Sequence, residues 1–153
     1  IGNTPVVIDS MAIVCPYSLA EFMLDLGFNV TSVISDGAPA YEKEIAESLD
    51  KTHPELQTIL PADPRLREEN YRENLIGDFS KDGSEKILAI GPMAAWVFNT
   101  PYFVNQIEND GAYGKLGMLS LLEKMKDALT NPKPIEKTVL QKGIGSSRCC
   151  FTL

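Results

Sequence analysis

Three residues with side chains capable of chemistry follow a short apolar run near the start of the chain. Asp9 and Ser10 come directly after Val6–Ile8, and Cys15 stands in the loop that follows. A carboxylate and a hydroxyl can bind a polar ligand, and a thiolate can bind a soft metal ion or face a cofactor. The same positions suit structural roles, since a strand-end Asp often closes a turn and a Cys near a helix start often packs as a small apolar residue.

The residues around these positions predict a strand, a loop and a helix. Val6–Ile8 has no polar alternation, as in a strand buried on both faces of a parallel sheet. Ser18 and Glu21 have the spacing of a capping box before a run of apolar residues at helical spacing, and Gly27 ends that run. Ligands of open parallel sheets bind beyond the carboxyl ends of the strands. We therefore expect the loop Asp9–Pro16 to line a crevice together with a turn at Gly91.

The rest of the chain continues the alternation of strands and helices. Strands are expected at 28–34, 56–60, 86–90 and 102–107, and helices after Pro39, through Tyr71, Leu75 and Phe79, at 92–98, and from Met118 to Leu129. This order predicts an α/β fold, a doubly wound parallel sheet of about five strands with helices on both faces, in a Rossmann-like arrangement. The most apolar strands, 6–8 and 87–90, should lie side by side at its centre.

Length bounds the domain organisation. The 153 residues suit one domain, which would bury about two thirds of the surface that the unfolded chain exposes. We expect a single domain over residues 1–134 and a C-terminal tail, 135–153, that is mobile or covers another domain, because its sequence has no periodicity. The chain begins at Ile1 rather than Met, which favours a fragment of a larger subunit.

Charge and cysteine content exclude several classes of function. The chain has 14 basic and 21 acidic residues, a net charge of -7, which argues against nucleic acid and anionic membranes as partners. No apolar run is long enough to cross a membrane, and no signal sequence opens the chain. The three cysteines, Cys15, Cys149 and Cys150, form neither an even disulfide framework nor a zinc-site spacing. We therefore expect a cytoplasmic protein.

Familiar catalytic and nucleotide-binding motifs are absent from the sequence. The loop after the first strand has no glycine, so it lacks the GxGxxG turn of dinucleotide-binding domains, and no GxxxxGK motif occurs. His53 is the only histidine, which leaves acid–base catalysis of the Ser-His type without an obvious partner. Gly111, Gly114 and Gly117 recur every third residue, which suits either close approach to a ligand or entry into a helix.

The segment from Lys86 to Pro132 resembles the last Rossmann-like domain of the nitrogenase component 1 family. It comprises KILAIG, a short helix with Trp96 and Phe98, TPYFVNQI, and then NDGAYGKLGMLSLLEKMKDALTNP. In that family a strand ending in glycine, a short helix with an aromatic residue, a loop with glycine and tyrosine, and a long helix closing on Asn-Pro come in the same order. SLAEFMLDLGFNVTSVISDG in the first half is similar to the family's helix ending in Leu-Gly and the next strand.

The resemblance implies an oxidoreductase assembled from several domains. Family subunits contain three such domains, pair into heterotetramers, and take electrons from an ATP-dependent iron–sulfur reductase to reduce a substrate at a buried metallocluster or tetrapyrrole site. The implied partners are sister domains, a paired component 1 subunit and an iron–sulfur ATPase reductase. This chain would contribute one wall of a metallocluster or substrate cavity, with Asp9, Ser10, Cys15 and Gly91 as candidate cofactor-binding residues, but no complete ligand set and no catalytic residue of its own.

One difference from the family limits which cofactor and substrate we expect. In the molybdenum–iron subunit the loop before the glycine-rich stretch supplies a histidine ligand, whereas here that loop, FVNQIEND, has none. A molybdenum–iron cofactor held in that way, and dinitrogen as substrate, are therefore not expected. Two alternatives stay open: a cofactor-assembly scaffold without catalysis, and a freestanding flavodoxin-like binding module, which would need a phosphate-binding turn after the first strand.

Overall fold

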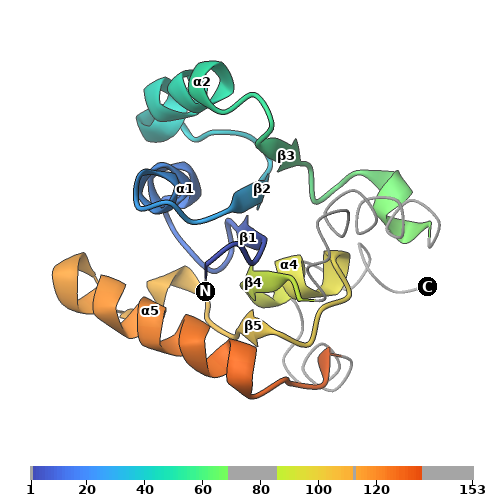
Figure 1. Ribbon diagram of the computed structural model, residues 1–153. Helices are drawn as coiled ribbons and strands as arrows, with labels where there is room; N and C mark the ends of the chain where they lie inside the picture. The colour runs from blue at the N-terminus through green and yellow to red at the C-terminus, as the bar shows by residue number, and fades with distance from the viewer. Residues whose placement is uncertain (1, 69–85, 112, 136–153) are drawn as a thin grey trace.

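The computed structural model describes residues 2–68, 86–111 and 113–135 (Figure 1). Within these ranges the chain forms one five-stranded sheet in which every strand pairs in parallel, in the order β3-β2-β1-β4-β5. The strands are β1 (Val6–Asp9), β2 (Val30–Ile34), β3 (Gln57–Ile59), β4 (Leu88–Ile90) and β5 (Phe103–Val104). The predicted fold class is confirmed, and β1 and β4 lie side by side at the centre as expected.

Helices cover both faces of this sheet. They are α1 (Pro16–Asp25), α2 (Lys43–Thr52), α4 (Pro92–Val97) and α5 (Gly114–Thr130), with 3-10 turns at Ala40–Glu42, Pro64–Arg67 and Glu108–Gly111. Figure 1 shows α1, α2 and α5 on one side of the sheet and α4 on the other. The helices after β1 and β4 thus leave toward opposite faces, which makes the carboxyl ends of these two strands the switch point of the fold.

Each face of the sheet has its own apolar core. Val6 and Ile8 of β1 pack with Met23 of α1 and Met125 of α5, whereas Val7 faces the cluster on the α4 side. The neighbouring strand β4 is also wholly buried. Strands with no polar alternation therefore occupy the centre because both of their faces meet helices.

The strands are shorter and some apolar residues more exposed than the sequence predicts. The expected strands 28–34 and 102–107 shrink to β2 and β5, because only residues facing a partner strand complete a ladder. Phe22 and Leu26, which belong to the apolar residues at helical spacing in α1, are 43% and 56% exposed. The predicted helix through Tyr71, Leu75 and Phe79, the tail beyond Ile135, and Cys149 and Cys150 lie outside the described residues.

The ends of the helices match the expected stop signals. Helix α1 ends before Gly27, which adopts a positive φ of 80°, and α5 ends before Asn131. Among the helices in the described ranges, none combines the length and the apolar character that a membrane span requires.

Candidate functional site

Asp9 lies buried at the switch point, where β1 and β4 end. The residue ends β1 and is 0% exposed. Its carboxylate accepts a hydrogen bond from the N–H of Ala12 in the following loop, at 2.7 Å, and one from the N–H of Ala94 in the first turn of α4, at 3.0 Å. Asp9 therefore joins the loop after β1 to the helix that follows β4.

Gly91 lies directly against this carboxylate. It links β4 to α4 with a φ of 114°, and a Cβ atom at this position would overlap the carboxylate of Asp9. Only glycine fits such a backbone conformation and such a close approach. Burial raises the pKa of Asp9 to about 6, although the backbone N–H groups around the carboxylate oppose this rise.

Ser10 is partly buried and lies at the same carboxyl edge of the sheet, where its backbone pairs with β2. Its N–H donates a hydrogen bond of 2.9 Å to the carbonyl oxygen of Ile34, which extends the pairing of β1 with β2 by one residue. Asp9, Ser10 and Gly91 thus lie together at the carboxyl edge of the central strands.

A second buried carboxylate closes the start of α1. Glu42 is 1% exposed, and its Oε1 atom accepts hydrogen bonds of 2.7 Å from both the N–H and the Oγ of Ser18. Its Oε2 atom accepts a longer bond of 3.4 Å from the N–H of Tyr17. The predicted capping box of Ser18 and Glu21 is therefore wrong: the helix begins at Pro16, and its cap comes from the next βα unit.

Cys15 occupies the position before α1 and is partly exposed. Desolvation and the negative charge of Glu42 together raise the pKa of its thiol. Part of the Cys15 side chain is therefore accessible to solvent. The electrostatic environment nevertheless favours the neutral thiol, which is a weaker nucleophile and metal ligand than the thiolate.

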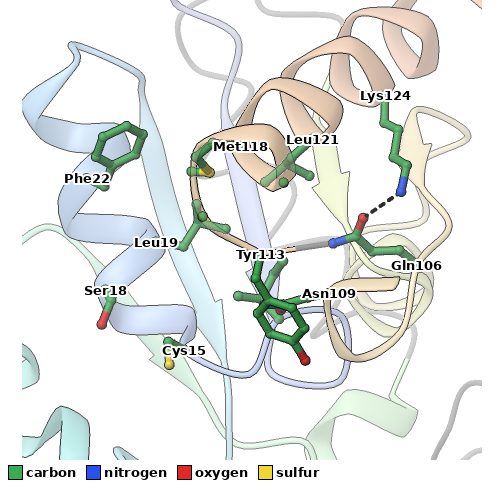
Figure 2. Close-up of a pocket in the computed structure, with 13 residues that line it drawn as sticks. Cys15, Ser18, Leu19, Phe22, Gln106, Asn109, Tyr113, Met118, Leu121 and Lys124 are labelled. Atoms are coloured by element: carbon green, nitrogen blue, oxygen red, sulfur yellow. Dashed lines mark hydrogen bonds between the residues drawn. The ribbon is translucent and has the colours of Figure 1, made fainter. Parts of the chain in front are cut away.

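A groove with a volume of about 300 Å³ lies between the first turns of α1 and α5. Figure 2 shows Cys15, Ser18, Leu19 and Phe22 along one side and Met118 and Leu121 along the other. We call it the α1–α5 groove; its lining comprises Ile13, Cys15, Ser18, Leu19, Phe22, Gln106, Asn109, Tyr113, Gly114, Gly117, Met118, Leu121 and Lys124. From the loop after β1, Ile13 and Cys15 contribute to this lining, whereas Asp9, Ser10 and Gly91, the other residues expected at the site, do not.

The loop between β5 and α5 is fixed against the loop after β1. The N–H groups of Glu108 and Asn109 donate to the carbonyl oxygens of Met11 and Ala12 at 2.9 and 2.8 Å. The Oδ1 atom of Asn109 accepts a bond of 3.0 Å from the N–H of Val14. Glu108, Asn109 and Asp110 all have positive φ, between 47° and 59°, a conformation that costs free energy in residues other than glycine.

Polar side chains join this loop to α5 at one end of the groove. The ammonium group of Lys124 donates to Oε1 of Gln106 at 3.3 Å and to Oδ2 of Asp110 at 3.0 Å (Figure 2 draws the first of these bonds). Gln106 is 5% exposed, and its Nε2 atom donates to the carbonyl oxygen of Ala12 at 3.4 Å. The two loops and α5 thus form one connected border of the groove.

Comparisons with known proteins found no match for this chain. No protein-family model, no curated protein and no solved structure matches it. The fold and the groove are therefore the observations from which function has to be argued.

Sequence reasoning indicated the loop with Cys15 on one side of the groove and Gly114 and Gly117 on the other, but it missed the polar side chains that join them. The loop with Cys15 was expected at the site, whereas Gln106, Asn109 and Lys124 were not, because their roles depend on contacts between distant segments. One signal was present: Asn109 and Asp110 precede Gly111, and such residues tolerate the left-handed conformation that this turn needs. Within the described residues, no group of three His, Cys, Asp or Glu side chains is placed to hold a metal ion.

Proposed function

We propose that this chain is a domain of a nitrogenase-like component 1 oxidoreductase subunit. In this proposal its α1–α5 groove forms one wall of a metallocluster or substrate cavity, and the surface around the groove meets sister domains and a paired subunit. Electrons for the reduction of the substrate come from an iron–sulfur ATPase partner in the cytoplasm.

The observation that carries the proposal is the position of the loop between β5 and α5. By the resemblance, this stretch corresponds to the loop that supplies a cofactor ligand in the molybdenum–iron subunit. In this chain the backbone of Glu108 and Asn109 holds the loop against the loop that carries Cys15, and both border the same groove. A groove at the carboxyl edge of a doubly wound sheet is where ligands of such folds bind.

The side chains of the described residues do not by themselves fit a metallocluster. Among the described residues that line it, the groove offers one thiol, Cys15, whose raised pKa favours the protonated form, and no histidine or carboxylate. Ligation requires the deprotonated thiolate. The proposal therefore assigns the ligand set to other domains of the assembly, with this chain shaping the cavity beside it.

Exposed apolar residues support the proposed interface. Tyr113, Leu116 and Leu119, at the start of α5, are 66%, 79% and 49% exposed, and Phe22 of α1 is exposed across the groove from Met118 (Figure 2). A group of large apolar side chains on one part of a surface is typical of contact with another protein. On this proposal, sister domains cover these residues.

Glu42 argues against the alternative of a freestanding flavodoxin-like module. In such folds the phosphate of the cofactor binds at the N-terminus of the first helix. Here the carboxylate of Glu42 accepts hydrogen bonds from the N–H groups of Tyr17 and Ser18. It places a negative charge where a phosphate would bind. A nucleotide would have to displace a buried carboxylate.

The test is purification of the protein under anaerobic conditions from cells that naturally make it, with an affinity tag on this chain. We expect two partners: a subunit carrying an iron–sulfur cluster, measured as iron, acid-labile sulfide and visible absorbance, and a separate ATPase that also contains iron. ATP-dependent bleaching of the cluster absorbance would support an oxidoreductase. Transfer of the cluster to another protein would support an assembly scaffold instead.

A pair of variants ties this result to the proposed surface. Leu116→Glu places a charge among the exposed apolar residues of α5 and should abolish recovery of the iron-containing partners. Ser48→Glu adds the same charge to the exposed surface of α2 and should leave recovery unchanged. Purification of the unsubstituted chain without iron-containing partners, together with tight binding of FMN, would overturn the proposal in favour of the flavodoxin-like alternative.

A further inference from the structure

We propose that the α1–α5 groove binds a small ligand with an apolar body and one acidic group, a carboxylate or a similar anion, and that Lys124 is its polar anchor. The inference deepens the proposed function, since it concerns the same groove and names the class of molecule that the cavity takes. It rests on residues of this chain alone, so it can be tested without any partner.

The apolar lining of the groove supports an apolar body for the ligand. Leu19 and Phe22 of α1 face Met118 and Leu121 of α5 across the opening (Figure 2), and Ile13 adds a further apolar side chain. Its volume of about 300 Å³ is at the lower end of the range for ligand pockets. One or two rings or a short acyl chain fit this space, whereas a dinucleotide does not.

The charge of the lining supports an acidic group on the ligand. Although the chain has a net charge of -7, Lys124 is the only charged residue among the described residues that line the groove. An ammonium group has three hydrogen-bond donors, and the carbonyl oxygen of Gln106 and the carboxylate of Asp110 accept from two of them. One donor is left for a ligand.

The start of α5 adds to the positive potential of the groove. Gly114 and Gly117 of its first turns line the groove, the first turn has no acidic residue, and the side chain of Tyr113, the residue before the helix, does not cap its N–H groups. The N-terminus of a helix of 17 residues has a partial positive charge. The ion pair with Asp110 offsets part of the charge of Lys124, and the helix N-terminus adds to what remains, which favours an anionic over a neutral ligand of the same shape.

The experiment compares two probes with the same ring system, 1-naphthoate and 1-naphthylmethanol, on the complete 153-residue chain. Isothermal titration calorimetry measures affinity, and amide chemical shifts in 15N-labelled protein report the location. We expect saturable binding of naphthoate, with shifts concentrated at Leu19, Gly114 and Gly117, and weaker binding of the alcohol. Absence of saturable naphthoate binding, or shifts centred elsewhere, would overturn the proposal.

Three variants separate the contributions. Lys124→Met should weaken naphthoate binding about three- to tenfold, the range for a partly exposed charged contact, and leave the alcohol unaffected. Lys126→Met, on the exposed side of the same helix, is the matched control and should change neither affinity. Equal effects of the two substitutions on naphthoate would contradict the anchoring role of Lys124.

Phe22→Ala keeps the proposal testable if Lys124→Met does not fold. Phe22 is 43% exposed, so its truncation spares the core, and it should weaken binding of both probes because it removes apolar wall from the groove. Unchanged affinity for both would count against the groove as the site. Naphthoate binding without recovery of iron-containing partners would reject the proposed function alone, and recovery of partners without naphthoate binding would reject this inference alone.

Discussion

At the level of single residues, Asp9 holds the two halves of the sheet together at their carboxyl ends. Its carboxylate accepts hydrogen bonds from the loop after β1 and from α4. It can approach the start of α4 this closely because Gly91 has no side chain. A buried carboxyl group in this position makes stability depend on pH, because burial raises its pKa to about 6 from an ordinary value of 3.8.

The first prediction concerns this pH dependence. Between about pH 4 and pH 6 the folded protein binds the Asp9 proton more tightly than the unfolded chain does, so the contribution of Asp9 to stability falls as pH rises through this range. Asp9→Asn cannot ionise. The difference in unfolding free energy between the wild type and this variant should therefore shift in favour of the variant by up to about 3 kcal/mol from pH 4 to pH 7.

Urea unfolding followed by circular dichroism at several pH values measures this difference. Asp36→Asn is the control, because Asp36 is exposed and its replacement should change stability only slightly. A constant difference between the wild type and Asp9→Asn across the range would contradict the assigned role of burial.

A second prediction at this level concerns Ser32 in β2. Its side chain is 0% exposed, and its Oγ atom has no hydrogen-bond partner among the residues that the structure describes. A buried hydroxyl without a partner is destabilising. Ser32→Ala should raise the free energy of unfolding by about 1 kcal/mol.

Thr31→Val is the matched control, since the Thr31 hydroxyl donates to the carbonyl oxygen of Val6 at 3.3 Å. It removes a hydrogen bond that is made and should lower stability by roughly 0.5–1 kcal/mol. Thermal or urea unfolding distinguishes the two directions. A Ser32→Ala protein less stable than the wild type would mean that the Ser32 hydroxyl contributes favourably to the fold.

At the level of elements, α1 depends on a residue of the following βα unit. Glu42 belongs to a run of charged residues, a pattern typical of a surface that faces water, yet the 3-10 turn after Pro39 directs it inward to the start of α1. Its Oε1 atom also accepts from the hydroxyl of Ser18, the residue that the sequence suggested as the cap. The third prediction tests this contact.

Glu42→Gln keeps one oxygen acceptor and removes the negative charge. The variant should lose about 1–2 kcal/mol of stability, because one N–H group of α1 loses its acceptor. It should also lower the pKa of Cys15, since the charge of Glu42 helps to raise that pKa. The rate of iodoacetamide modification of Cys15, measured by peptide mass spectrometry, should then rise at lower pH than in the wild type.

The pH dependence of the modification rate distinguishes an electrostatic effect from local opening of the helix. Local opening of the helix would increase the modification rate by a similar factor at every pH, whereas loss of the Glu42 charge moves the profile along the pH axis. Glu44→Gln, an exposed neighbour in the first turn of α2, should do neither. An unmoved profile in Glu42→Gln would contradict the electrostatic link between Glu42 and Cys15.

The elements also show what sequence can and cannot predict here. Val6–Ile8 and Ile87–Ile90 were placed correctly at the centre because continuous apolar runs need cover on both faces. The ends of β2 and β5 were overestimated, since a strand's length is set by its partners. Contacts between units, such as Glu42 with Ser18 or Asn109 with Val14, depend on how the units pack, and local patterns do not encode them.

At the level of the whole molecule, the switch point divides the described chain into two halves that share one sheet. β1 pairs with both β2 and β4, so the ladder continues from one half to the other. The carboxylate of Asp9 and the loop between β5 and α5 add hydrogen bonds across the same boundary. Each of the two apolar cores also takes residues from both halves, and we therefore expect the halves to unfold together.

Native-state hydrogen exchange tests this last prediction. The amides of Val6 and Leu88, which bond to carbonyl oxygens of Asn29 and Pro5, lie in the buried centre of the sheet and should exchange only through global unfolding, with the same free energy of opening. The edge strand β3, whose Gln57 and Thr58 are exposed, should open at lower free energy. Two distinct opening energies for Val6 and Leu88, separable by urea, would show that the halves are independent units. In that case the groove, which takes lining from both, would be the contact between two independently folding parts, and ligands would act by stabilising that contact.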